Sequence, residues 1–184
     1  MTFRQVVTER MRSMYRQFQE NGRMDYRIEK DRCAQFDFFR RNGIAHPKIQ
    51  KIWYSREQIL DDVTSGSAIG DMMEHWPIFF KACHLTQRSS LGTFAISSVN
   101  ELDDSNQKKQ ELIQWINDKW EYRSRDVDRP WQTEGDVLTD ALTPSFLVQE
   151  PMINSKGRPH AVFKLDGRVS SGLVEIKVEV FWGK

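Results

Sequence analysis

The stretch from Trp76 to Ile96, "WPIFFKACHLTQRSSLGTFAI", constrains the fold more than any other part of the sequence. It holds two short apolar runs, PIFF and GTFAI, separated by a polar segment. Short runs rich in aromatic residues and bounded by proline or polar residues are typical of buried strands. The stretch therefore predicts a β-hairpin with a polar tip, in which Lys81 stands at the end of the first strand.

The rest of the sequence alternates amphipathic helices with short strands. We expect helices at residues 3–20, 28–41 and 102–122, a short helix or turn at 56–63, strands at 47–55, 145–150, 160–169 and 172–182, and loops at 64–71 and 123–144. The first helix should end at Asn21-Gly22, and Gly43 offers a left-handed cap to the second. Asp103 to Ser105 are candidate caps for the longest helix. This order predicts an α+β fold with a mainly antiparallel sheet.

Composition excludes several classes of protein. The chain has 184 residues, a hydrophobic fraction of 39% and a net charge of +1, which suit a globular core and give no overall field for nucleic acid or anionic membranes. No run is long and apolar enough for a membrane span or a signal peptide, so we expect a cytoplasmic protein. The two cysteines, Cys33 and Cys83, form no CxxC motif, and we expect neither a disulfide framework nor a structural zinc site.

The polar end of the predicted hairpin offers two kinds of chemistry. Cys83 and His84 are adjacent, and adjacent residues on a strand point to opposite faces, so we expect a packed thiol and a loop histidine rather than a nucleophile or metal pair. Lys81 must either reach water from the strand edge or meet a buried anion. Ser89 and Ser90 in the following loop are donors suited to phosphate oxygens, so both interpretations of Lys81 remain open.

The segment "VQEPMI", residues 148–153, suggests a complementary site for a flat ring. A strand that leaves a sheet exposes its backbone, so the carbonyl of Glu150 and the amide of Met152 could hydrogen-bond adenine. Pro151 lies between them and has no amide to donate.

Four stretches in order resemble one family: "KDRCAQFDFFRRNGIAHP", "PIFFKACHLTQRSSLGT", "WINDKWEYRSRDVDRPW" and "FLVQEPM". Together they resemble the ATP-grasp superfamily of ATP-dependent ligases, most closely its TupA-like branch, named for teichuronopeptide biosynthesis. The resemblance covers roughly residues 25–170. It implies an α+β fold of two lobes with mainly antiparallel sheets. The implied domains are an N-terminal segment 1–75, a small lobe 76–146 and the start of a C-terminal lobe 147–184, which would be incomplete.

The resemblance also implies a function and a site. ATP would lie between the lobes, and the protein would be a carboxylate ligase that acts through an acylphosphate, on a small-molecule, glycan or peptide acceptor in surface polysaccharide or peptide-conjugate biosynthesis. The implied ATP-binding residues are Arg32 and Lys81 at the phosphates, Ser89, Ser90 and Gly92 in the covering loop, and Gln149, Glu150 and Met152 at the adenine. The resemblance identifies no catalytic residue.

Magnesium is the second implied cofactor, but its ligands in this family come from strands beyond this sequence. Glu175 and Glu179 are the candidates within it, although Lys177 lies between them on the same face and a solvated face explains all three. A noncatalytic nucleotide-binding module without the metal site is therefore the alternative function. Binding of single-stranded nucleic acid by "KWEYRSRDVDRPW" is a third possibility, against which Asp126 and Asp128 argue.

Overall fold

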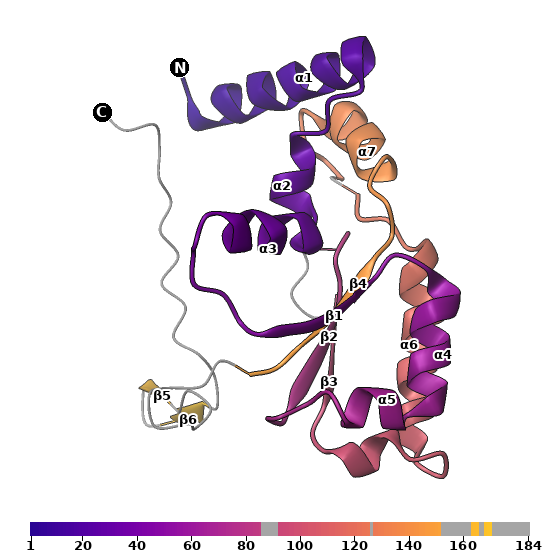
Figure 1. The fold of residues 1–184 in the computed structure, drawn as a ribbon. Helices are drawn as coiled ribbons and strands as arrows, with labels where there is room; N and C mark the ends of the chain where they lie inside the picture. Colours follow the sequence, from indigo (N-terminus) through magenta and orange to yellow (C-terminus); the bar gives the residue numbers. More distant parts are fainter. Residues whose placement is uncertain (86–91, 126, 152–162, 166–167, 171–184) are drawn as a thin grey trace. The chain divides into compact units, whose positions relative to one another are not determined.

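The computed structural model describes residues 1–85, 92–125, 127–151, 163–165 and 168–170. These residues belong to two compact units, Met1–Glu150 and Pro151–Lys184. Figure 1 shows the first unit as a small sheet with helices on both of its faces.

The sheet of the first unit has four antiparallel strands. They are β1 (Ile49–Trp53), β2 (Ile78–Ala82), β3 (Thr93–Ile96) and β4 (Phe146–Gln149), arranged in the order β1-β4-β2-β3. The pairing of β2 with β3 confirms the predicted hairpin. The last strand of the unit, β4, lies between β1 and β2 and is buried along its whole length. The expected α+β class with an antiparallel sheet is thus confirmed.

Helices α4 (Arg56–Ser65) and α6 (Gln107–Glu121) pack together on one face of the sheet, and α5 (Ser67–Gly70) and a 3₁₀ turn, η1 (Val99–Leu102), lie at their ends (Figure 1). Residues at alternate positions of each strand point to this face. Phe80 of β2, Trp53 of β1 and Phe146 of β4 are fully buried here against Ile59 of α4 and Ile116 of α6. This cluster is the main core.

The opposite face of the sheet is covered by α3 (Arg32–Arg41), which follows the short helix α2 (Tyr26–Lys30). Here a smaller cluster joins Cys33 of α3 to Cys83 and Leu147, with Ile49 and Ile52 of β1 packed against it. The first residue of α3 is Arg32, which was predicted to lie at the phosphates.

The first and last helices of the unit pack on each other. α1 (Phe3–Asn21) contributes Met11 and Met14, and α7 (Gln132–Asp140) contributes Leu138, to a third cluster that also holds Tyr26 and Leu142. α1 ends at Asn21-Gly22, as predicted, and Gly22 caps it with a left-handed backbone, φ 69°.

Four predicted boundaries were wrong. The expected helix 28–41 is broken at Asp31, whose side chain caps α3. The expected loops contain α5 and α7. The helix expected at 102–122, α6, begins at Gln107, later than expected, because Asn106 rather than Asp103 to Ser105 accepts from its first turn. Hydrogen bonds from short polar side chains to the backbone set the start of two of these helices, α3 and α6.

The second unit contributes a short antiparallel hairpin, β5 (Phe163–Leu165) and β6 (Arg168–Ser170), where a single strand at 160–169 was expected. The expected strand 172–182 lies outside the described residues. Across the described part of the chain, no helix is both long and apolar enough to cross a membrane.

Candidate functional site

Lys81 lies on the α3 face of the sheet. Along β2, Ile78, Phe80 and Ala82 are buried in the main core, whereas Phe79 and Lys81 are half-buried. Because side chains alternate along a strand, Phe79 and Lys81 share the opposite face. The register places Lys81 between Thr93 of β3 and Leu147 of β4. Lys81 therefore stands on the sheet surface, not inside the core.

Arg32 comes to the same place from the other side. Its backbone N–H donates to the carbonyl of Cys83 over 2.9 Å, and its guanidinium donates to the hydroxyl of Thr93 over 3.3 Å. Since Thr93 is the direct cross-strand partner of Lys81, the first residue of α3 and the end of β2 meet at Thr93. The structure thus brings together two cations that are separated by 49 positions in the sequence.

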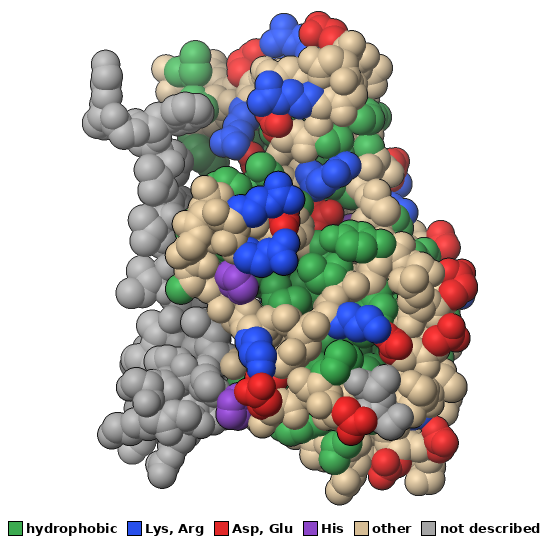
Figure 2. All heavy atoms as spheres, viewed as in Figure 1, with side chains coloured by type: hydrophobic (Ala, Val, Ile, Leu, Met, Phe, Trp, Pro, Cys, Tyr) green, Lys and Arg blue, Asp and Glu red, His purple; other side chains and the backbone are tan. Residues whose placement is uncertain are grey.

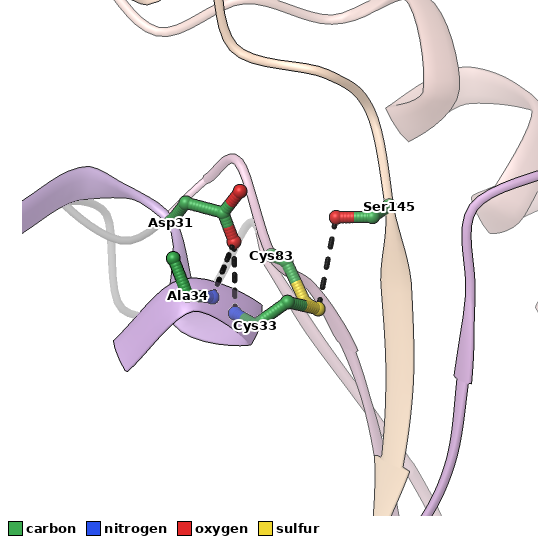
Figure 3. The surroundings of a disulfide bond; sticks show 5 residues. All are labelled: Asp31, Cys33, Ala34, Cys83 and Ser145. Carbon is green, nitrogen blue, oxygen red and sulfur yellow. Dashed lines mark hydrogen bonds between the residues drawn. A yellow bond between two sulfur atoms is a disulfide. The ribbon is translucent and has the colours of Figure 1, made fainter. Parts of the chain in front are cut away.

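A disulfide between Cys33 and Cys83 ties α3 to the end of β2 (Figure 3). Their Cα atoms are 5.5 Å apart, and both residues are buried. The backbone N–H of Cys83 donates to the carbonyl of Ser145 over 2.8 Å, and the hydroxyl of Ser145 donates to the sulfur of Cys33. The prediction of a packed thiol at Cys83 was wrong, because the only other cysteine in the chain comes within bonding distance.

Asp31 fixes the first turn of α3 beside this disulfide (Figure 3). One carboxylate oxygen accepts from the backbone N–H groups of Cys33 and Ala34, over 2.8 and 3.2 Å. Burial raises the pKa of Asp31, and the two amides partly oppose that rise. Asp31, Cys33 and Cys83 offer ligand atoms within 4.8 Å of one another. In the disulfide form the sulfurs are not thiolates, so this group does not have the character of a metal site.

His84 points away from these residues, as expected for the neighbour of Cys83. It is buried against Phe146, and its Nε2–H donates to the carbonyl of Lys119 over 3.0 Å. Burial lowers the pKa of His84 to about 4, so the ring is neutral at physiological pH. His84 lies in the turn after β2, as the prediction of a loop histidine requires, but it is buried in the core.

Gln149 and Glu150, predicted to lie at the adenine, are both buried. Gln149 is the cross-strand partner of Phe79, so it lies on the same face as Lys81. Its side-chain oxygen has no hydrogen-bond partner among the described residues. Glu150 differs, because its carboxylate accepts from the side chain of Gln50 and from the backbone N–H of Glu74. Gln149 is therefore the residue that offers an acceptor to a ligand.

Gly92 lies at the start of β3 and is buried. A Cβ atom at this position would be 2.6 Å from the carbonyl oxygen of Leu85, so only glycine fits. The remaining predicted site residues lie outside the described residues: Ser89, Ser90, Met152, Glu175 and Glu179.

The basic and aromatic segment after α6 is engaged within the protein. Arg125 pairs with Asp140 over 2.7 Å, Arg123 donates to the carbonyls of Trp120 and Tyr122, and Arg129 lies over the ring of Trp131. These contacts connect the end of α6 to α7. They engage the basic and aromatic side chains on which the possible binding of single-stranded nucleic acid was based.

Sequence reasoning missed Thr93 and the structural role of Asp31. Thr93 follows Gly92 in the predicted returning strand, and only the register of the hairpin shows that it faces Lys81. The capping role of Asp31 could have been predicted, because an aspartate directly before an amphipathic segment is a typical N-terminal cap.

Comparisons with known proteins found no matching family model, no similar curated protein and no similar solved structure. The case for a function therefore depends on the arrangement of Arg32, Lys81, Thr93 and Gln149.

Proposed function

We propose that this protein binds ATP on the α3 face of its sheet and acts as an ATP-grasp-type carboxylate ligase. The observation that carries the proposal is the meeting of Arg32 and Lys81 at Thr93. The guanidinium of Arg32 donates to the hydroxyl of Thr93, and Lys81 is the cross-strand partner of Thr93. A guanidinium, a hydroxyl and a lysine on the neighbouring strand form a donor set that suits phosphate oxygens. The likeness of four sequence stretches to the ATP-grasp superfamily supports the same function.

The other end of the nucleotide would lie toward β4. Gln149 shares the face of Lys81, and its side-chain oxygen lacks a partner in the part of the chain that the structure describes. An unsatisfied buried acceptor costs about 1–3 kcal/mol, and the exocyclic amino group of adenine is a donor that would satisfy it. Phe79, half-buried beside Gln149, offers a ring surface to a base. The residues present therefore fit both ends of ATP.

In this proposal Arg32 and Lys81 hold the phosphates and offset the charge that develops when the terminal phosphoryl group passes to a carboxylate. Glu175 and Glu179 are the candidate ligands that would hold Mg²⁺, which would supply further positive charge at the phosphates. Phosphoryl transfer leaves ADP, and an amine or a similar nucleophile would then attack the carbonyl carbon of the acylphosphate and displace inorganic phosphate. We place the reaction in the cytoplasm, on a small-molecule, glycan or peptide carboxylate, in surface polysaccharide or peptide-conjugate biosynthesis.

Calorimetric titration with ATP, with and without Mg²⁺, tests the binding step. We expect Lys81→Ala to weaken ATP binding by roughly 10- to 100-fold, because it removes one charge-assisted contact. Lys108→Ala is the matched control, since Lys108 belongs to α6 on the other face of the sheet, over the ring of Phe94. If the wild-type protein does not bind ATP at about millimolar concentration, or if both variants weaken it equally, the proposed site is wrong.

Measuring ATP turnover distinguishes a ligase from a noncatalytic nucleotide-binding module. With Mg²⁺ and a panel of organic, glycan and peptide carboxylates, hydroxylamine should trap an acylphosphate as a hydroxamate while ADP accumulates. ATP binding that depends on Lys81 but produces neither ADP nor hydroxamate would favour the nucleotide-binding module.

A further inference from the structure

A cavity of about 780 Å³ lies on another part of the first unit, between α2, α3 and β1. Its lining includes the apolar side chains of Phe36, Ile49 and Ile52. Four consecutive residues of β1, 49–52, contribute to one wall. Cavities of this size are typical of ligand sites. Lys81, Thr93 and Gln149 are not among its lining residues, so it is distinct from the proposed nucleotide site.

The wall formed by β1 is an edge of the sheet. β1 stands first in the order β1-β4-β2-β3, and within the described ranges it pairs with β4 alone. In Figure 1 the sheet is viewed from this edge, with β1 nearest the viewer, α3 to one side and α4 to the other. An edge strand presents unpaired N–H and C=O groups, which can pair with an added strand.

Large apolar side chains are exposed where the cavity opens. Tyr54 is 64% exposed, Ile28 47% and Phe38 43%, and all three line the cavity. Apolar groups that are exposed together around one cavity indicate a surface that binds a partner. An extended peptide would cover them with alternate side chains while its backbone pairs with β1.

Cations surround the same opening. Arg27, Arg40, Arg41 and Lys51 line the cavity, against two acids, Asp31 and Asp37. Figure 2 shows Lys and Arg side chains around apolar ones on this face. Lys51 pairs with Asp62 on α4, and Asp37 accepts from both Arg40 and Arg41, so these two guanidiniums share one carboxylate. The cations that outnumber the acids around the cavity are therefore Arg40 and Arg41 on α3, with Arg27 nearby.

We propose that this cavity and the edge of β1 bind an extended acidic peptide segment of a partner protein. Its backbone adds a strand to β1, its apolar side chains cover Ile49, Ile52 and Tyr54, and its carboxylates face Arg27, Arg40 and Arg41. The edge position of β1 favours a peptide over a small anion. A small anion would bind the cations alone, whereas a peptide can also form backbone hydrogen bonds along the unpaired edge of β1. This inference is independent of ATP binding.

Fluorescence anisotropy with a labelled octapeptide of alternating glutamate and valine tests the proposal. We expect a Kd on the order of 10 μM for the wild-type protein. N-methylation of alternate peptide amides keeps every charge and side chain but removes the backbone donors, and should weaken binding at least about 10-fold. A lysine–valine peptide of the same length should not bind.

The matched variants are Arg40→Gln/Arg41→Gln and Arg4→Gln/Arg16→Gln. Both pairs are on helices, and Arg4 and Arg16 are exposed on α1 outside the cavity. Only the first pair should weaken binding, by roughly 10-fold. Three results each overturn the proposal: no binding at about 1 mM protein, equal binding of the N-methylated peptide, which would indicate a site for anions alone, or equal effects of the two variant pairs.

Discussion

His84 shows at the scale of one residue how a polar side chain can serve the core. It is buried against Phe146 and hydrogen-bonded to the carbonyl of Lys119. Its pKa is lowered to about 4 by burial, below the ordinary value of 6.5. The unfolded chain therefore binds a proton in the interval between these values and the folded protein does not. His84 favours the folded state above this interval, and that contribution is lost as the pH falls through it.

We expect the free energy of unfolding to fall by on the order of 3 kcal/mol between pH 7 and pH 4 because of His84. Urea unfolding at several pH values measures this change. His84→Phe lacks the titrating group and should show a shallower dependence on pH, although it loses the hydrogen bond to Lys119. Since the other histidines are common to both proteins, parallel curves for the two proteins would mean that His84 titrates normally.

Lys81 and Arg32 illustrate how far single residues could be predicted. Alternation along β2 was sufficient to place Lys81 on a strand and to separate Cys83 from His84. It could not show that Arg32 would reach Thr93, because that contact depends on where α3 docks. The sequence also could not show that the side-chain oxygen of Gln149 is buried without a partner among the described residues, since the residues around it come from strands far apart in the sequence.

At the scale of the element, α3 owes its starting point to Asp31. The sequence predicted one helix through this position, because apolar spacing continues across it. The structure breaks the helix there, since the Asp31 carboxylate accepts from two backbone N–H groups of α3 and the backbone of Asp31 itself is extended. α7 was missed for the opposite reason: Gly135 and Thr139 weaken the helical pattern, but both are buried against other elements.

We expect Asp31→Ala to lower the free energy of unfolding by about 1 kcal/mol, because it removes the cap of α3. Asp31→Asn should be close to neutral, since an amide oxygen can accept the same bonds without a buried charge, which the raised pKa of Asp31 shows to be unfavourable. Urea unfolding of the three proteins compares them. If Asp31→Asn lowered the free energy of unfolding more than Asp31→Ala, the charge of Asp31 rather than its capping hydrogen bonds would be the source of its contribution to stability.

At the scale of the whole molecule, the disulfide links residues that are 50 positions apart. The sequence contained the information that only one pairing was possible, but it could not show that α3 brings Cys33 to Cys83. A reducing cytoplasm would hold the two as adjacent thiols, and an oxidising compartment would hold them as a disulfide.

Closing a loop of this length should stabilise the fold by about 4 kcal/mol in the chain-entropy description. We therefore expect oxidised wild-type protein to unfold at a higher urea concentration than reduced wild type or Cys33→Ser/Cys83→Ser. The reductant should have no effect on the double variant, which is the control. Thiol titration of the unreduced protein checks the premise, because two reactive thiols after denaturation would show that the bond had not formed.

The position of β4 has a consequence for the order in which the protein can form as it leaves the ribosome. β1 and β2 are made early, but they are not neighbours, and β4 fills the place between them. Until residue 149 has emerged, α4 and α6 have only separate pieces of the sheet to pack on. Nascent chains that stop before this strand would expose the apolar faces of α4 and α6, and would be the forms that most need a chaperone.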